Sequence, residues 1–231
     1  DFGSGRNCEP AKSIRCNGVA SLHGESIFDV CLFSLGYGAF ALVSGSEDCS
    51  AKISVIHEWR VLHTIALPLQ ASGIRAVCSC SLRPGLMLVA VAGKEAAFYS
   101  VHHDSSQMAS EISVKRIGVG NPPGKQSIDQ RLNAVVACSV STDGDEAIVV
   151  TGDSSGRCVL YRFNCDSETA RPQATVLYRD ERPILSLELS GWQNEFILVV
   201  GTTAGDIILL NLPNPLSFAE KPLFRYKAHS M

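Results

Sequence analysis

The chain has 231 residues, which allows one large domain or two small ones. Hydrophobic residues make up 45% of it and charged residues 19%, so the chain can build a core and extended disorder is excluded. The net charge of -3 argues against a broad nucleic-acid footprint but leaves room for a local basic patch. Every apolar run is strand-sized and too short to span a bilayer as a helix.

Cysteine usage indicates a reducing compartment. The chain holds nine cysteines, an odd number, and no Asn-x-Ser/Thr sequon. Several thiols lie within apolar runs, where a cysteine serves as a small buried hydrophobe. We therefore expect reduced thiols in the cytosol or the nucleus rather than a secreted disulfide framework, and of these two we expect a cytoplasmic protein. Since the chain opens without Met, we also expect it to be a fragment of a longer polypeptide.

The segment Glu146–Phe163, EAIVVTGDSSGRCVLYRF, shows the unit on which the chain is built. Two apolar runs rich in β-branched and aromatic residues flank a short turn of Gly, Asp and Ser, which is a hairpin signal. Equivalent hairpins recur along the chain and are marked by Gly45, Gly93, Gly152 and Gly201. Short strands that repeat every roughly 40–50 residues are typical of propeller blades.

Taken in chain order, residues 1–22 show little periodicity and are expected to form a connector or the outer strand of a preceding blade. The predicted strands that follow are 27–33, 40–44, 50–56 and 60–67; 75–81, 86–92, 96–101 and 111–117; 132–140, 147–151, 158–163 and 174–178; 184–189, 196–200, 207–212 and 223–226. An insertion over 101–130 widens the middle interval. Within it, His102–Ser106 and Gly118–Lys125 are predicted loops around a single strand.

These strands predict an all-β propeller with four blades of four antiparallel strands, as part of a larger propeller. The predicted blade boundaries are 23–68, 69–130, 131–180 and 181–231. Each sheet has two apolar faces and buries both only by stacking on its neighbours. Closure into a ring of roughly seven or more blades would remove most exposed sheet edges.

The turns resemble those of the WD-repeat family. Ser44–Ile53, SGSEDCSAKI, resembles the family's Ser-Gly-Ser-x-Asp-Gly-Thr hairpin, and so do Thr151–Tyr161 and Gly201–Leu209. In the family, a His, a Ser or Thr, the turn Asp and a Trp form a buried hydrogen-bonded set. The resemblance implies that only the first blade keeps part of this set, through Ser44 and Asp48, because the chain contains neither a Trp-Asp nor a Gly-His dipeptide.

A narrower resemblance covers two segments. Leu86–Ala96 has a shortened hairpin and is followed by the insertion and then by Asp129–Val135, DQRLNAV. This order is similar to that in the WD-repeat regulatory subunit of the eukaryotic tRNA wobble-position 2′-O-methyltransferase. The resemblance implies a non-catalytic scaffold without a cofactor of its own, which positions tRNA for a separate methyltransferase chain.

Patterns that suggest reactive or ligand-binding sites are incomplete. His102-His103-Asp104 lacks the second cluster that a metal site needs, and we interpret it as a solvated loop. Cys78 and Cys80 share one face of a strand and are expected to fill one side of a sheet. Gly124–Ser127 lacks the spacing of a phosphate-binding loop, and we interpret Gly152–Gly156, GDSSG, as a hairpin turn rather than as a nucleophile elbow. We predict no catalytic, cofactor-binding or metal-binding residue.

Four basic residues bracket the insertion and are tentative surface contacts: Lys115, Arg116, Lys125 and Arg131. If the insertion folds over the rim of the propeller, these side chains can reach phosphate groups, and binding would then depend on salt. The alternative, which we favour, is that they are ordinary solvated charges of a mildly acidic protein.

Trp192, in the predicted turn 190–194, is a further tentative contact with a partner, although it can equally cap the edge of the core. Two other functions stay open beside a scaffold for tRNA modification. One is a general WD-repeat adaptor for protein complexes in ubiquitin ligation, signalling or trafficking. The other is an enzyme on a propeller, which would need a cleft where titratable side chains converge.

Overall fold

The computed structural model describes residues 22–68, 70, 72–104, 111–120, 123, 129–140, 144, 146–164, 172–192, 195–212 and 222–229. All regular structure over these residues is strand, arranged as sixteen strands in four four-stranded antiparallel sheets. This confirms the predicted all-β fold and the grouping of the strands in fours. The predicted connector 1–22 lies almost wholly outside the described residues and stays a prediction.

Each sheet is a meander in which every strand pairs with the next one along the chain. The first two sheets contain β1 (Ile27–Gly36), β2 (Ala39–Ser46), β3 (Ala51–His57) and β4 (Arg60–Ala66), then β5 (Ala76–Arg83), β6 (Leu86–Ala92), β7 (Ala96–His103) and β8 (Ile112–Gly120). The last two contain β9 (Leu132–Ser139), β10 (Glu146–Asp153), β11 (Arg157–Asn164) and β12 (Gln173–Arg179), then β13 (Ile184–Trp192), β14 (Glu195–Thr202), β15 (Asp206–Leu212) and β16 (Phe224–Lys227).

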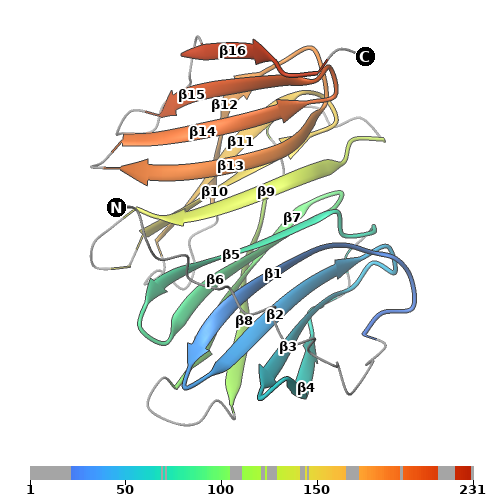
Figure 1. Cartoon of the computed structure of the whole chain (residues 1–231), viewed down its shortest axis with the longest axis vertical. Coiled ribbons are helices and arrows are strands. Elements are labelled where there is room, and N and C mark those ends of the chain that lie inside the picture. Colours follow the sequence, from blue (N-terminus) through green and yellow to red (C-terminus); the bar gives the residue numbers. More distant parts are fainter. Residues whose placement is uncertain are drawn as a thin grey trace, which may run out of the picture.

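The four sheets stand side by side as blades (Figure 1). The innermost strands β1, β5, β9 and β13 contact one another in that order. The first and fourth sheets lie at opposite ends of the row (Figure 1). This is the arrangement of consecutive blades around part of a propeller.

The core consists of three apolar clusters, one between each pair of neighbouring sheets. Strand β6, which reads LMLVAVA, is buried throughout because it contributes to two of them. Val89 and Val91 pack toward the first sheet, whereas Leu88 and Ala90 pack toward the third. Successive side chains of a strand point to opposite faces, so an inner blade requires an unbroken apolar run rather than an alternating one.

The predicted loops of the insertion are partly wrong, since β7 and β8 both extend into them. His102 and His103 belong to β7, where they pair with Ser113 and Ile112 of β8. The glycine-rich stretch from Gly118 to Gly120 is the end of β8 rather than a loop. A Cβ on Gly120 would lie 2.5 Å from Tyr161 Cε1, so glycine is what lets the strand pass against this ring.

Two turn boundaries also need correction. The predicted turn at 190–194 begins later, because Ser190, Gly191 and Trp192 continue β13 and pair with β14. The hairpin glycines Gly45 and Gly152 lie in the last residues of β2 and β10, and their turns follow them.

The row of sheets leaves an apolar face exposed at each end. On the first sheet, Val30 and Leu32 are 52% and 58% exposed, and on the fourth, Leu185 and Tyr226 are 53% and 55% exposed. Scattered surface hydrophobics are normal, but a contiguous face of this kind marks a contact surface. Within the described residues, the structure contains no helix that could cross a membrane.

Candidate functional site

A hydrogen-bonded set centred on His23 joins the segment before β1 to the turn between β2 and β3. His23 Nε2 lies 2.8 Å from Ser44 Oγ, and its Nδ1 lies 2.9 Å from Ser50 Oγ and 3.2 Å from Asp48 Oδ2. The imidazole is buried, with 1% of its side chain exposed. Because a carboxylate only accepts hydrogen bonds, this geometry places a hydrogen on Nδ1, directed toward Asp48.

The Asp48 carboxylate is strongly held in its ionised form. Burial opposes ionisation, but hydrogen bonds from Ser50, the Gly24 N–H and His23 outweigh it and hold the pKa of Asp48 well below its usual range. The family resemblance predicted Ser44 and Asp48 in such a set, and the structure brings them together. Sequence reasoning missed His23 because the family's dipeptide is Gly-His, whereas here Leu22 precedes the histidine.

In the second and third sheets, other polar contacts take the place of this set where the incoming segment meets the sheet. Gln70, in the segment that leads into β5, donates from Nε2 to the hydroxyl of Tyr99 at 3.1 Å. Gln130, just before β9, donates from Nε2 to Asp153 Oδ2 at 3.0 Å. Arg157 Nε donates to the same oxygen at 2.8 Å in a buried ion pair. In each case a residue of the segment that leads into a sheet is hydrogen-bonded to a strand of that same sheet.

The tentative basic contacts do not gather into one site. Lys115 and Arg116 are exposed on β8, the outermost strand of the second sheet, and Arg116 Nη2 lies 3.6 Å from Glu95 Oε1. Arg131 precedes β9, the innermost strand of the third sheet, and its main chain exchanges hydrogen bonds with Ser154.

Lys125 and the side chain of Trp192 lie outside the described part of the structure. The main chain of Trp192 ends β13, and Asn133 Nδ2 near the start of β9 donates to Ile184 O at the start of β13. Arg131 and Trp192 are therefore at opposite ends of neighbouring strands. All of these residues remain predictions as contact sites.

The histidines of β7 face a cavity of about 500 Å³ beside the outer strand of the first sheet. His63, His102, His103 and Glu111 contribute to its lining, and burial lowers the pKa of His103. Over the described residues, no group of three or more His, Cys, Asp or Glu side chains is arranged to hold a metal ion.

Cys31 and Cys78, on two innermost strands, are protonated at neutral pH because their pKa values are raised. Burial raises the pKa of Cys31 to about 11, with an opposing hydrogen bond to Ser79 and a further rise from Asp29. Burial also raises the pKa of Cys78 well above the usual value, and Cys31, Cys80 and Asp29 add to the rise. A thiol rather than a thiolate is a poor nucleophile, so these residues act as packing groups, as their pattern predicted.

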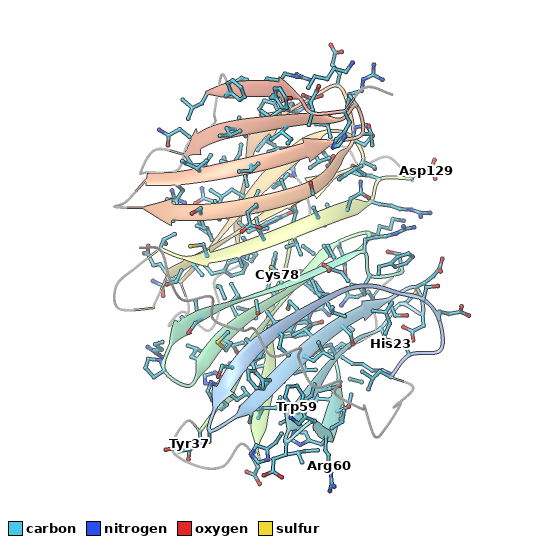
Figure 2. All side chains as sticks on the ribbon, viewed as in Figure 1. His23, Tyr37, Trp59, Arg60, Cys78 and Asp129 are labelled. Atoms are coloured by element: carbon cyan, nitrogen blue, oxygen red, sulfur yellow. The ribbon has the colours of Figure 1, made fainter. Side chains whose placement is uncertain are left out.

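Two aromatic side chains are exposed to solvent at the hairpin turns of the first sheet. Tyr37 and Trp59 are 64% and 78% exposed and line a groove of about 520 Å³ together with Leu32, Phe40 and Ile56. Figure 2 shows both aromatic residues at the end of the sheet remote from His23.

Comparisons with known proteins give a limited result. No family model matches the sequence, and no curated protein matches it. Among solved structures, the chain is similar to the crystal structure of the β-propeller domain of Myceliophteria thermophila Cps50 (Swd1), with a TM-score of 0.48 and 13% sequence identity. The match covers 88% of this chain and 59% of that one, so the chain spans less than two thirds of that domain.

The fold assignment rests on the strand pairing and on the joints between the sheets. The strands group in fours with their innermost members adjacent, and the first sheet carries the His, Ser and Asp of the WD-repeat set. The chain has the fold of four consecutive blades of a β-propeller.

Proposed function

We propose that the chain is a non-catalytic WD-repeat scaffold that binds other proteins. The observation that carries this proposal is that the buried polar groups form hydrogen bonds that hold the sheets together. His23 and Asp48 join the first sheet to its incoming segment, and Gln130, Asp153 and Arg157 do the same for the third. Groups that an enzyme would direct into a cleft are used here to hold blades rigidly in register.

The specific form of the proposal is a regulatory subunit of a tRNA 2′-O-methyltransferase complex that acts in the cytoplasm. It is supported by the resemblance of Leu86–Ala96 and Asp129–Val135. In this scheme the chain supplies surface and orientation, while a separate methyltransferase subunit binds the methyl donor and carries out the chemistry. The tRNA reaches the scaffold as part of the complex.

Several residues that carry this resemblance have structural roles. The shortened turn between β6 and β7 is closed by a hydrogen bond from Gly93 N–H to Glu95 O at 3.0 Å. Gln130 binds Asp153, and Asn133 Nδ2 donates to Ile184 O at 2.9 Å. These residues therefore help to set the second, third and fourth blades against one another. Binding of tRNA to the chain needs a direct test.

A filter-binding assay with labelled tRNA tests the specific form. The full-length protein should retain tRNA at low salt and lose it steeply as salt rises, because phosphate contacts release counterions. Addition of the methyltransferase subunit should raise retention, and methyl transfer to the wobble position should require both chains. Absence of retention at low salt, with or without that subunit, would remove the tRNA form of the proposal.

The alternative is a general protein adaptor, and the exposed Tyr37 and Trp59 favour it. Tyr and Trp are enriched where proteins bind one another, and here two of them share one groove. The same filter assay separates the two functions, since an adaptor does not retain tRNA under any of its conditions.

A further inference from the structure

A polar cleft of about 430 Å³ lies between the outer strands of the third and fourth sheets. It is formed where β12 ends, where β15 begins and where β16 ends. Strands β12 and β16 are the edge strands of their sheets (Figure 1). Four cationic side chains contribute to the lining: Arg179, Arg182, Arg225 and Lys227.

Arg225 is held in a fixed position within this cleft. Its Nη1 lies 3.1 Å from Asp180 Oδ2, and its Nε donates to Asp206 Oδ2 at 3.0 Å. The side chain of Asp180 is only 2% exposed and also accepts from the Tyr178 hydroxyl at 3.0 Å. The Arg225 side chain nevertheless stays 46% exposed, so part of its five-donor guanidinium faces the cleft.

Positive charge is in excess around this arginine. Two of the three carboxylates in the lining, those of Asp180 and Asp206, are already bound to Arg225. The other three cationic side chains form no ion pair with the described residues, and the third carboxylate, Glu181, is exposed. A small region of net positive charge therefore sits on a chain whose net charge is -3.

We propose that this cleft binds a phosphorylated serine or threonine in an extended segment of a partner protein. A phosphomonoester concentrates nearly two negative charges and three acceptor oxygens at one point, which is what clustered arginines recognise. The free edge of β16 lies beside the cleft and offers main-chain groups to an extended peptide. The proposal rests on the proposed scaffold function, because the phosphopeptide arrives as part of a partner protein.

A nucleic-acid strand fits this cleft less well. Single-stranded RNA needs a groove of positive charge that follows several successive phosphates. Here the cations occupy one short cleft, and Asp180, Glu181 and Asp206 would repel the neighbouring phosphodiesters. A peptide carries only one phosphate, and its backbone N–H groups can donate to the exposed carboxylate of Glu181.

Fluorescence anisotropy with the 231-residue chain tests the proposal. The probes are a labelled Gly/Ala peptide with one central phosphoserine, its unphosphorylated twin and a labelled single-stranded RNA oligomer at the same ionic strength. The phosphopeptide should bind about tenfold or more tightly than its twin, and inorganic phosphate should compete with it. Arg182→Ala and Arg225→Lys should each weaken binding about tenfold, because each loses a charge-assisted hydrogen bond.

Arg60→Ala is the matched control, since it removes the same charge from an exposed site at the far end of the molecule (Figure 2). Thermal unfolding of each variant verifies that Arg225→Lys still folds, and Arg182→Ala tests the cleft from an exposed position. Equal binding of the two peptides, or equal effects of Arg182→Ala and Arg60→Ala, would overturn the proposal. Binding of the RNA alone would also overturn it while supporting the tRNA function. Retention of tRNA by the full-length protein, without any binding of the phosphopeptide, would overturn the cleft proposal and leave the scaffold intact.

Discussion

At the scale of single residues, the buried polar side chains show how this sequence departs from the family pattern. The first sheet keeps the His, Ser and Asp of the pattern as His23, Ser44 and Asp48. The Trp of the pattern is replaced: Ser54 stands at its position, ten residues after Ser44, just as Tyr161 stands ten residues after Thr151 in the third sheet. Ser54 bonds to Thr64 at 2.9 Å and does not reach back to the histidine. The fold therefore tolerates loss of the Trp as long as the incoming segment is fixed by some other polar contact.

The Asp48 carboxylate should make the free energy of unfolding depend on pH in the acidic range. Its pKa in the folded protein lies below the ordinary aspartate value, so ionisation favours the native state. The contribution is present at neutral pH and is lost as the pH falls below about 4, through the folded-state pKa. Asp48→Asn should lower the free energy of unfolding at pH 7 by about 1–3 kcal/mol and flatten its fall in acid.

Urea unfolding followed by tryptophan fluorescence at a series of pH values measures this effect. Glu47→Gln, at the exposed neighbour on the same turn, is the control and should leave the pH dependence unchanged. Parallel pH profiles for Asp48→Asn and the unaltered chain would show that the His23 set does not depend on the charge of Asp48.

At the scale of elements, two of the four repeating hairpin glycines, Gly45 and Gly152, are packing sites for the next sheet. A Cβ on Gly45 would lie 2.4 Å from Ile74 Cγ2, and a Cβ on Gly152 would lie 2.4 Å from Ile184 Cγ2. Ile74 lies just before β5 and Ile184 is the first residue of β13, so each isoleucine lies where the following sheet begins. Sequence spacing found these glycines as markers of a period, and the structure shows why the period places glycine there.

Gly45→Ala and Gly152→Ala should each destabilise the chain by about 1–3 kcal/mol, because the added methyl group overpacks the joint between two sheets. Gly24→Ala is the control, since a Cβ there would meet nothing within 4 Å. Thermal and urea unfolding would measure all three. Equal stability of the Gly45 and Gly24 variants would mean that the second sheet can shift to make room.

The turn between β3 and β4 carries backbone strain. Glu58 and Trp59 have φ values of 48° and 64°, in the left-handed region that disfavours residues with a Cβ. A two-residue turn of this kind prefers Asn-Gly. The double substitution Glu58→Asn with Trp59→Gly should therefore raise the free energy of unfolding by about 1 kcal/mol.

Trp59→Ala separates strain from exposure, because it removes the exposed indole but keeps a Cβ at the same φ. It should stabilise the chain less than the double substitution does in differential scanning calorimetry. If the two variants have the same melting temperature, the exposed ring and not the backbone is the source of the instability.

At the scale of the whole molecule, stability comes from stacking, and over the described residues each of the two terminal sheets has a neighbouring sheet on one side only. Their outer faces expose Leu32 on β1 and Tyr226 on β16, at opposite ends of the row of sheets (Figure 1). Burial of a large apolar side chain is worth about 1.5–3 kcal/mol, so these faces should drive association of the 231-residue chain with itself.

Sedimentation velocity over a range of concentrations tests this expectation. Leu32→Lys and Tyr226→Lys should each shift the distribution toward the monomer, since each places a charge on a terminal face. Val119→Lys, on the second sheet, is the control and should leave the distribution unchanged. A chain that stays monomeric at all concentrations would contradict this expectation, because the apolar terminal faces would then not drive self-association.

The sequence by itself determined the strands, their grouping in fours and the all-β class. These features depend on local patterns: strand-forming runs of four to ten residues, turn residues between them and a repeating glycine. Strand ends were less predictable. The glycines that end β8 look like a loop in the sequence but continue the strand, and Gly120 lies against Tyr161 of the next sheet.

Only the tertiary structure decided which polar residues act together. Gln70 and Tyr99 are 29 residues apart, and His23 and Ser44 are 21 apart, with no motif to link either pair. The basic cleft joins a loop of the third blade to the last strand of the fourth. Secondary structure follows from periodicity along the chain, whereas a site forms where strands and turns separated in the sequence meet, and that meeting depends on how the apolar faces of the sheets stack.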